Sequence, residues 1–177
     1  MFNLEFVFPE IFLSLSIMFL LILGVFKKKS SKLVQNISLI VLLITAVITF
    51  NETLGIEEIL LFNESIIIDY LSSFMKIVTL LAAFLVLIIS SNYLKTLKIF
   101  KIEYPILILS SVLGMMIMIS SNDLIVFYMG LELQSLALYV LATFNRDQLK
   151  SSEAGLKYFV LSALSSGLLL YGCSLIY

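Results

Sequence analysis

The stretch FPEIFLSLSIMFLLILGVFKKK, residues 8–29, sets the pattern that the rest of the chain repeats. An α-helix needs about 20 apolar residues to cross the roughly 30 Å hydrocarbon core of a bilayer. This run has that length and contains a single charged residue, Glu10, before it ends in three lysines. It is therefore predicted to span a membrane. No Lys or Arg precedes it, which disfavours a cleavable signal peptide.

Similar apolar runs bounded by charged or turn residues recur along the 177 residues. The predicted spans are 8–26, 34–50, 66–91, 104–120, 124–144 and 154–177. Hydrophobic residues make up 61% of the chain and charged residues only 13%, a composition that excludes an ordinary soluble domain. We expect a single all-α integral membrane domain over residues 1–177, a bundle of about six transmembrane helices.

The connections between these spans alternate in charge, as the two sides of a membrane require. Nine basic residues share one side: Lys27, Lys28, Lys29, Lys32, Lys95, Lys98, Lys101, Arg146 and Lys150. The opposite loops contain no Lys or Arg and hold Glu52, Glu57, Glu58, Glu64, Asn122 and Asp123. The basic side is the bacterial cytoplasm or the mitochondrial matrix, so the N-terminus is predicted to lie outside. Residues 51–65 are expected to form a short amphipathic element on the membrane surface.

Several classes of function are disfavoured by what the sequence contains. A net charge of −1 gives no basic footprint for nucleic acid. With one cysteine, Cys173, and no histidine, we expect no metal site. The sequence has no nucleotide-binding motif and no hydrolytic triad, so we expect no catalytic or cofactor-binding residue on this chain.

Glu132 is the strongest candidate for a functional residue, because it falls near the middle of the fifth span. An unpaired carboxylate there is costly and tends to be protonated or paired. At helical spacing Tyr128, Glu132, Ser135, Tyr139 and Thr143 share one stripe that could line a hydrated path. The alternative is a structural hydrogen bond between helices that never changes protonation, with Tyr128 and Tyr139 serving in packing.

Two lysines fall inside predicted spans and need partners. Lys157 can reach Glu153 one turn earlier, or Glu132, or it can extend to the inner surface. For Lys76 the favoured explanations are extension to the outer surface or an ion pair with Asp69, seven residues before it.

Small residues repeat at i,i+4 spacing in two of the spans and allow close approach between helices. They are the pair Ser110 and Gly114 in the fourth span, and Ser162, Ala163, Ser166 and Gly167 in the sixth.

Residues 104–177 resemble the antiporter-like subunits of proton-pumping NADH:quinone oxidoreductase, and specifically subunit 2, called subunit N in bacteria. The resemblance rests on GMMIMISSNDL (114–124), YMGLELQSL (128–136), EAGLKYF (153–159), SSG (165–167) and YGCSLIY (171–177). It implies that Glu132 and Lys157 belong to a proton-translocation machinery, with Glu153, Tyr128, Ser135, Tyr139 and Lys76 as possible supporting residues. The first three spans agree with it mainly in number, length and orientation.

Subunits of this family have about fourteen helices arranged as inverted repeats, so this sequence corresponds to the N-terminal portion. The resemblance implies a second chain or a longer chain that carries the remaining helices, other membrane-arm subunits and membrane lipids as partners, and FMN, iron–sulfur clusters and quinone on other subunits. Redox catalysis is not expected on this chain. Composition favours the mitochondrial inner membrane, and a bacterial plasma membrane is the alternative. A scaffold subunit without proton transport and a multi-subunit cation/proton antiporter are the competing functions.

Overall fold

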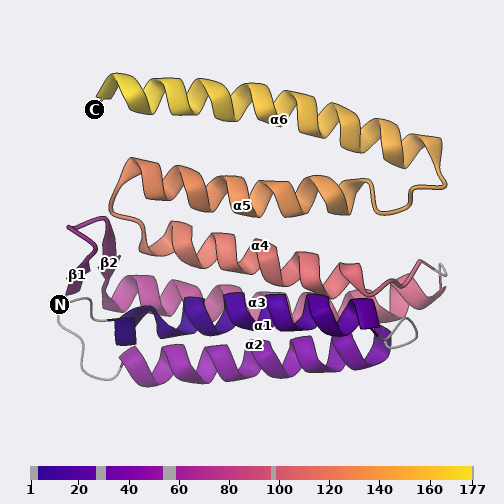
Figure 1. The fold of residues 1–177 in the computed structure, drawn as a ribbon, viewed down its shortest axis with the longest axis horizontal. Helices are drawn as coiled ribbons and strands as arrows, with labels where there is room; N and C mark the ends of the chain where they lie inside the picture. The colour runs from indigo at the N-terminus through magenta and orange to yellow at the C-terminus, as the bar shows by residue number, and fades with distance from the viewer. Residues whose placement is uncertain (1–3, 27–30, 54–58, 97–98, 177) are drawn as a thin grey trace.

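A computed structural model describes residues 4–26, 31–53, 59–96 and 99–176 of the chain (Figure 1). Its elements in chain order are the 3-10 helix η1 (Leu4–Val7), α1 (Phe8–Phe26), α2 (Ser31–Thr53), β1 (Ile59–Leu61), β2 (Ile66–Ile68), α3 (Tyr70–Thr96), α4 (Glu103–Ser120), α5 (Leu124–Ala142) and α6 (Leu149–Ile176). Each of the six α-helices is long and apolar enough to cross a membrane. The six-helix membrane bundle expected from the sequence is confirmed.

The third helix begins later than the sequence predicts. Residues 66–68 form β2, and α3 starts at Tyr70 and runs to Thr96 instead of covering 66–91. Asp69 fixes this boundary, because its Oδ1 accepts a hydrogen bond from Ser72 N at 2.8 Å and so caps the helix. The sixth helix starts at Leu149 instead of residue 154, and the fifth ends at Ala142, two residues before the predicted limit.

The surface element expected over 51–65 is divided in the structure: residues 51–53 belong to α2, and residues 59–65 belong to a β-hairpin. Strands β1 and β2 pair antiparallel, with Ile59 opposite Ile68 and Leu61 opposite Ile66. Residues 54–58, which include two of the four glutamates of that segment, lie outside the described residues. Asn122 ties the hairpin to the α4–α5 connection, since its N donates to Ser65 O at 2.9 Å and its Nδ2 to Glu64 O at 2.7 Å.

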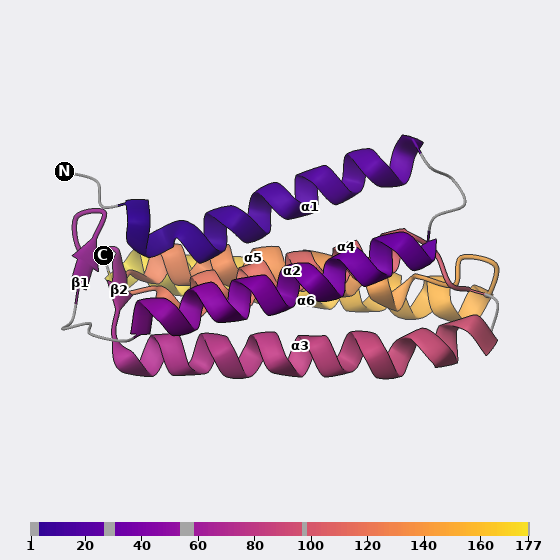
Figure 2. The same cartoon turned by 90° about the horizontal axis from the view of Figure 1, so that it is seen from below.

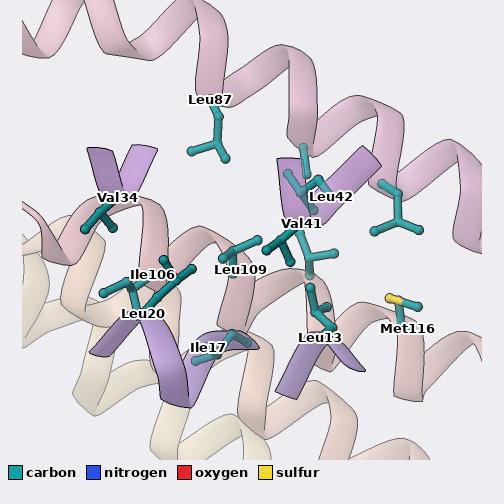
Figure 3. Packing of buried hydrophobic residues seen from close by; sticks show 13 residues of the cluster. Leu13, Ile17, Leu20, Val34, Val41, Leu42, Leu87, Ile106, Leu109 and Met116 are labelled. Atoms are coloured by element: carbon teal, nitrogen blue, oxygen red, sulfur yellow. The ribbon is translucent and has the colours of Figure 1, made fainter. Parts of the chain in front are cut away.

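Helices α1 to α4 share one apolar core, and α5 and α6 are added to it in sequence (Figures 1 and 2). The core side chains interdigitate between the four helices (Figure 3) and are Leu13, Ile17, Leu20, Val34, Val41, Leu42, Leu80, Ala83, Leu87, Ile106, Leu109, Val112 and Met116. Helix α5 packs on α4, and α6 packs on α5, so the bundle extends to one side of its core. The large apolar side chains of α6 remain exposed, for example Leu161 at 68% and Leu168 at 65%.

The connections lie at two opposite ends of the bundle, as the charge pattern predicts. The hairpin, the α4–α5 connection, the start of η1 and the end of α6 lie at one end of the bundle (Figure 1). At the other end the α3–α4 connection meets the α5–α6 connection: Lys101 Nζ lies 6.0 Å from the centre of the Phe144 ring, and the Tyr104 and Phe144 rings are 5.7 Å apart. The described basic loop residues therefore gather on one side.

Helices α4 and α5 approach each other until their backbones touch. A Cβ at position 114 would lie 2.6 Å from Gln134 N and 2.8 Å from Gly130 O. A Cβ at position 130 would lie 2.8 Å from Met118 N. Two glycines facing each other thus form this crossing, as small residues do between membrane helices. The close approach expected at Gly114 is confirmed, whereas Gly167 of α6 has no described atom within 4 Å of a Cβ placed there.

We predict that Gly114→Ala destabilises the bundle and that Gly167→Ala does not. The methyl group at position 114 meets backbone atoms, which cannot move aside without shifting a whole helix, and overpacking of this kind costs about 1–3 kcal/mol. Thermal unfolding in lipid nanodiscs measures the difference. Gly167→Ala is the matched control, because its methyl group enters open space and improves helix propensity. Equal midpoints for the two variants would show that the crossing is not a tight contact.

Candidate functional site

Helix α5 places Glu132 beside Tyr128, four residues earlier on the same face. The Tyr128 hydroxyl donates a hydrogen bond to Glu132 Oε1 at 3.1 Å. The hydroxyl of Ser135 donates to the backbone carbonyl of Glu132 at 3.0 Å and not to its carboxylate. Both Tyr128 and Glu132 are partly buried. The carboxylate therefore has a neutral partner within the bundle, which is one way for a membrane to tolerate it.

Tyr139 joins the stripe of α5 to α6. It is 6% exposed, and its hydroxyl forms a hydrogen bond with Ser162 Oγ. Its ring stands edge-on to the rings of Tyr158 and Phe159, with centroids 4.9 and 5.7 Å apart. At the end of the stripe Thr143 faces Gly155, the one residue of α6 that is buried. The predicted stripe therefore lies along the α5–α6 contact.

Lys157 pairs with Glu153, which is one of the partners considered from the sequence. Its Nζ lies 2.6 Å from Glu153 Oε1, an i,i+4 pair on α6. Both side chains are exposed, 70% for Lys157 and 64% for Glu153. Among the described residues, no ion pair within 4.0 Å joins Lys157 to Glu132. The two residues on which the proton-translocation hypothesis rests are thus not in direct contact here.

The structure corrects the expectation for Lys76. This side chain is 3% exposed, and its Nζ lies 2.6 Å from Oε1 of Glu10, whose side chain is 10% exposed. The lysine does not extend to the outer surface, and its ion pair is with Glu10 instead of Asp69. Lys76 lies two turns beyond Asp69, about 10 Å along the helix axis. Its ammonium is therefore closer to Glu10 of α1 than to the carboxylate at the start of its own helix.

Asp69 caps the start of α3 and is hydrogen-bonded to Ser72. Burial raises the pKa of this carboxyl, but hydrogen bonds from the backbone and hydroxyl of Ser72 outweigh it and leave the pKa below its ordinary value. The carboxylate therefore stays ionised as a helix cap.

No role and no partner were predicted for Glu10 from the sequence. It is the single charged side chain of the first span and lies next to Pro9 at the start of α1. A carboxylate and an ammonium that are each isolated within separate spans are natural candidates for pairing with each other, because each is costly alone. That signal could have identified the Glu10–Lys76 pair.

We predict that removing either charge of the Glu10–Lys76 pair destabilises the protein more than removing both. Breaking a buried ion pair leaves an uncompensated charge and costs about 3–5 kcal/mol, whereas replacing both partners is often neutral. Glu10→Gln, Lys76→Met and the double variant are compared by thermal unfolding in nanodiscs. Additive losses in the double variant would contradict a coupled pair.

Comparison with known proteins supports one family. The family described as "NADH:quinone oxidoreductase/Mrp antiporter, TM" matches residues 121–177. NADH-quinone oxidoreductase subunit N of Pelagibacter ubique is 70% identical over 99% of this chain, and subunit N of Maricaulis maris is 51% identical over 99%. The chain covers 37% and 36% of these two relatives.

A solved structure shows the same arrangement of helices. A chain of respiratory complex I from Thermus thermophilus with bound aureothin superposes with a TM-score of 0.79 at 25% identity. The superposition covers 96% of this chain and 36% of that one. Sequence and fold thus agree over nearly the whole chain, which is similar to part of NADH-quinone oxidoreductase subunit N and spans 37% of the length of the Pelagibacter ubique protein.

Proposed function

We propose that this chain is part of the proton-translocating membrane arm of a respiratory NADH:quinone oxidoreductase. The observation that carries the proposal is Glu132, a partly buried carboxylate in the middle of α5 whose hydrogen-bond partner is the neutral Tyr128. A carboxylate in such a place can take up and release a proton without losing a fixed counter-charge. The chain is 70% identical to a protein named NADH-quinone oxidoreductase subunit N, which supports a role for this carboxylate in such a complex.

In this proposal Glu132 carries the proton and Tyr128 orients its carboxylate. Tyr139 and Ser162 continue the polar stripe toward the α5–α6 connection. Lys157, paired with Glu153 on the exposed side of α6, changes partner when other segments pack against that side. The driving force is redox chemistry on other subunits, where FMN, iron–sulfur clusters and ubiquinone are bound. The proposal assigns no redox step to this chain.

The remaining length of the relatives is proposed to complete the proton path. The exposed apolar face of α6 fits helices of the same subunit, whether they belong to a second polypeptide or to a longer chain, together with neighbouring membrane-arm subunits and lipids. The relatives described above are bacterial, which favours the bacterial plasma membrane over the mitochondrial inner membrane. The chain then crosses the membrane several times with its N-terminus outside.

A cation/proton antiporter is the second candidate, because the matching family description names Mrp antiporters beside NADH:quinone oxidoreductase. It predicts sodium movement without oxidation of NADH. A scaffold role without proton transport is the third. The identity to subunit N over 99% of the chain favours the first candidate.

We predict that Glu132→Gln lowers the number of protons pumped per NADH oxidised while the complex still assembles. The amide keeps the shape of the carboxylate and cannot exchange a proton. Pumping is measured with a pH-sensitive dye in vesicles containing the purified complex. Asp147→Asn is the matched control, since Asp147 is an exposed carboxylate in the α5–α6 connection. Normal pumping in an assembled Glu132→Gln complex rejects the proton role, and loss of assembly supports the scaffold.

We also predict that the purified assembly contains flavin and iron–sulfur subunits together with the remaining subunit N helices. A mass-spectrometric inventory of the intact complex, tagged on this chain, identifies them. Recovery of antiporter subunits without flavin would support the second candidate instead.

A further inference from the structure

A cavity of about 320 Å³ lies near the hairpin end of the bundle. It is lined by residues of η1, α1, the hairpin, α3 and α4, it is partly open to the surface, and apolar side chains make up most of its wall. Its polar residues are Glu10, Ser14, Lys76 and Ser120. This places the buried Glu10–Lys76 pair on the wall of a space separate from the α5–α6 contact that holds Glu132.

Two polar atoms on this wall have no protein partner. Among the described residues, Glu10 Oε2 and Ser120 Oγ are buried and take part in no hydrogen bond, although Glu10 Oε1 is bound to Lys76. Leaving a buried carboxylate oxygen bare is costly, and buried groups of this kind are usually satisfied by ordered water. The cavity is roomy enough, since a water occupies about 30 Å³.

We propose that the polar end of this cavity holds water hydrogen-bonded to Glu10 Oε2 and Ser120 Oγ, and that the Glu10–Lys76 pair exchanges protons with that water. The pair thereby forms a second proton-carrying site at the outer end of the bundle. The role of this site in pumping rests on the proposed function above. The presence of the water and its proton exchange with the pair do not depend on that function.

The proton transfer needs no group beyond those present. One N–H bond of the Lys76 ammonium breaks and an O–H bond forms on Glu10 Oε1 across their 2.6 Å contact, leaving a neutral amine and a neutral acid. A cavity water then gives one proton to Glu10 Oε2 as the proton on Oε1 returns to the Lys76 amine. This leaves the ammonium beside a carboxylic acid protonated on Oε2 and a hydroxide in the cavity, and the reverse step releases the proton.

Other titratable groups lie near the Glu10–Lys76 pair. Glu52 at the end of α2 interacts electrostatically with both Glu10 and Lys76. Asp69, before α3, interacts with Lys76. From α4 the polar group that faces the cavity is Ser120, and from β2 the lining side chains are apolar. Acidic groups from α1, α2 and the start of α3 therefore lie around one ammonium.

Two other occupants fit less well. A metal cation would compete with the Lys76 ammonium, which already lies against the Glu10 carboxylate. A lipid chain would fill the apolar wall but would leave both bare oxygens unsatisfied.

Radiolytic water labelling of the intact complex in nanodiscs tests the water. Hydroxyl radicals made from bound water modify the side chains beside it, so we expect rapid labelling of Ile117 and Leu113 on the cavity wall. Ser120→Ala removes one polar partner, and most of this labelling should be lost. The matched control is Ser111→Ala, a buried serine of the same helix that does not line the cavity. Labelling that is absent in the native complex, or unchanged by Ser120→Ala, overturns the proposal.

Infrared difference spectra recorded after a pH jump test the proton exchange. We expect a carbonyl band of a buried carboxylic acid that shifts in D2O and disappears in Glu10→Gln. If Glu10→Gln does not assemble, the Ser120→Ala complex is measured instead, and the band should move because its hydrogen bonds change. A band insensitive to both D2O and Ser120→Ala overturns the exchange. Loss of pumping in Glu132→Gln with no such band would sink this inference and leave the proposed function standing.

Discussion

The backbone contact between α4 and α5 at Gly114 and Gly130 is the constraint on which the arrangement of this molecule depends. Helix α4 belongs to the four-helix core, and α5 carries Glu132. Helix α6 is held mainly through α5. The crossing of two glycines therefore sets where the membrane carboxylate stands relative to the core. Between membrane helices, where lipid is as apolar as leucine, close packing of this kind replaces the hydrophobic effect as the force that holds helices together.

The charged groups inside the spans are stabilised in two different ways. Glu132 accepts a hydrogen bond from Tyr128 on its own helix, and Lys157 pairs with Glu153 on its own helix. Glu10 and Lys76 instead pair between α1 and α3, with almost no exposure. The first kind can form in an isolated helix, because residues four apart face each other. The second kind requires the folded bundle, and it links α1 and α3 near the hairpin end of the bundle.

Burial is distributed unevenly over the six helices. The α1–α4 core is closed, whereas α6 presents an apolar face with little of it covered. The relatives are longer, and the chain matches 37% of the Pelagibacter ubique protein. In a membrane, such a face meets either lipid or further helices. The proposed proton path through Glu132 is complete only when further helices pack against this face.

The sequence alone determined the number of spans, the segregation of the described basic loop residues at one end, and the contacts formed within single helices. Apolar run length, loop charge and i,i+4 spacing are local properties, and Glu132 with Tyr128 and Lys157 with Glu153 follow from them. Only the tertiary structure decided the partner of Lys76, the glycine crossing and the hairpin where the third helix was expected to begin. The physical reason is that a helix in a bilayer is apolar on its packed side and on its lipid side alike. Its sequence therefore does not mark which face turns inward, and contacts between distant residues depend on that rotation.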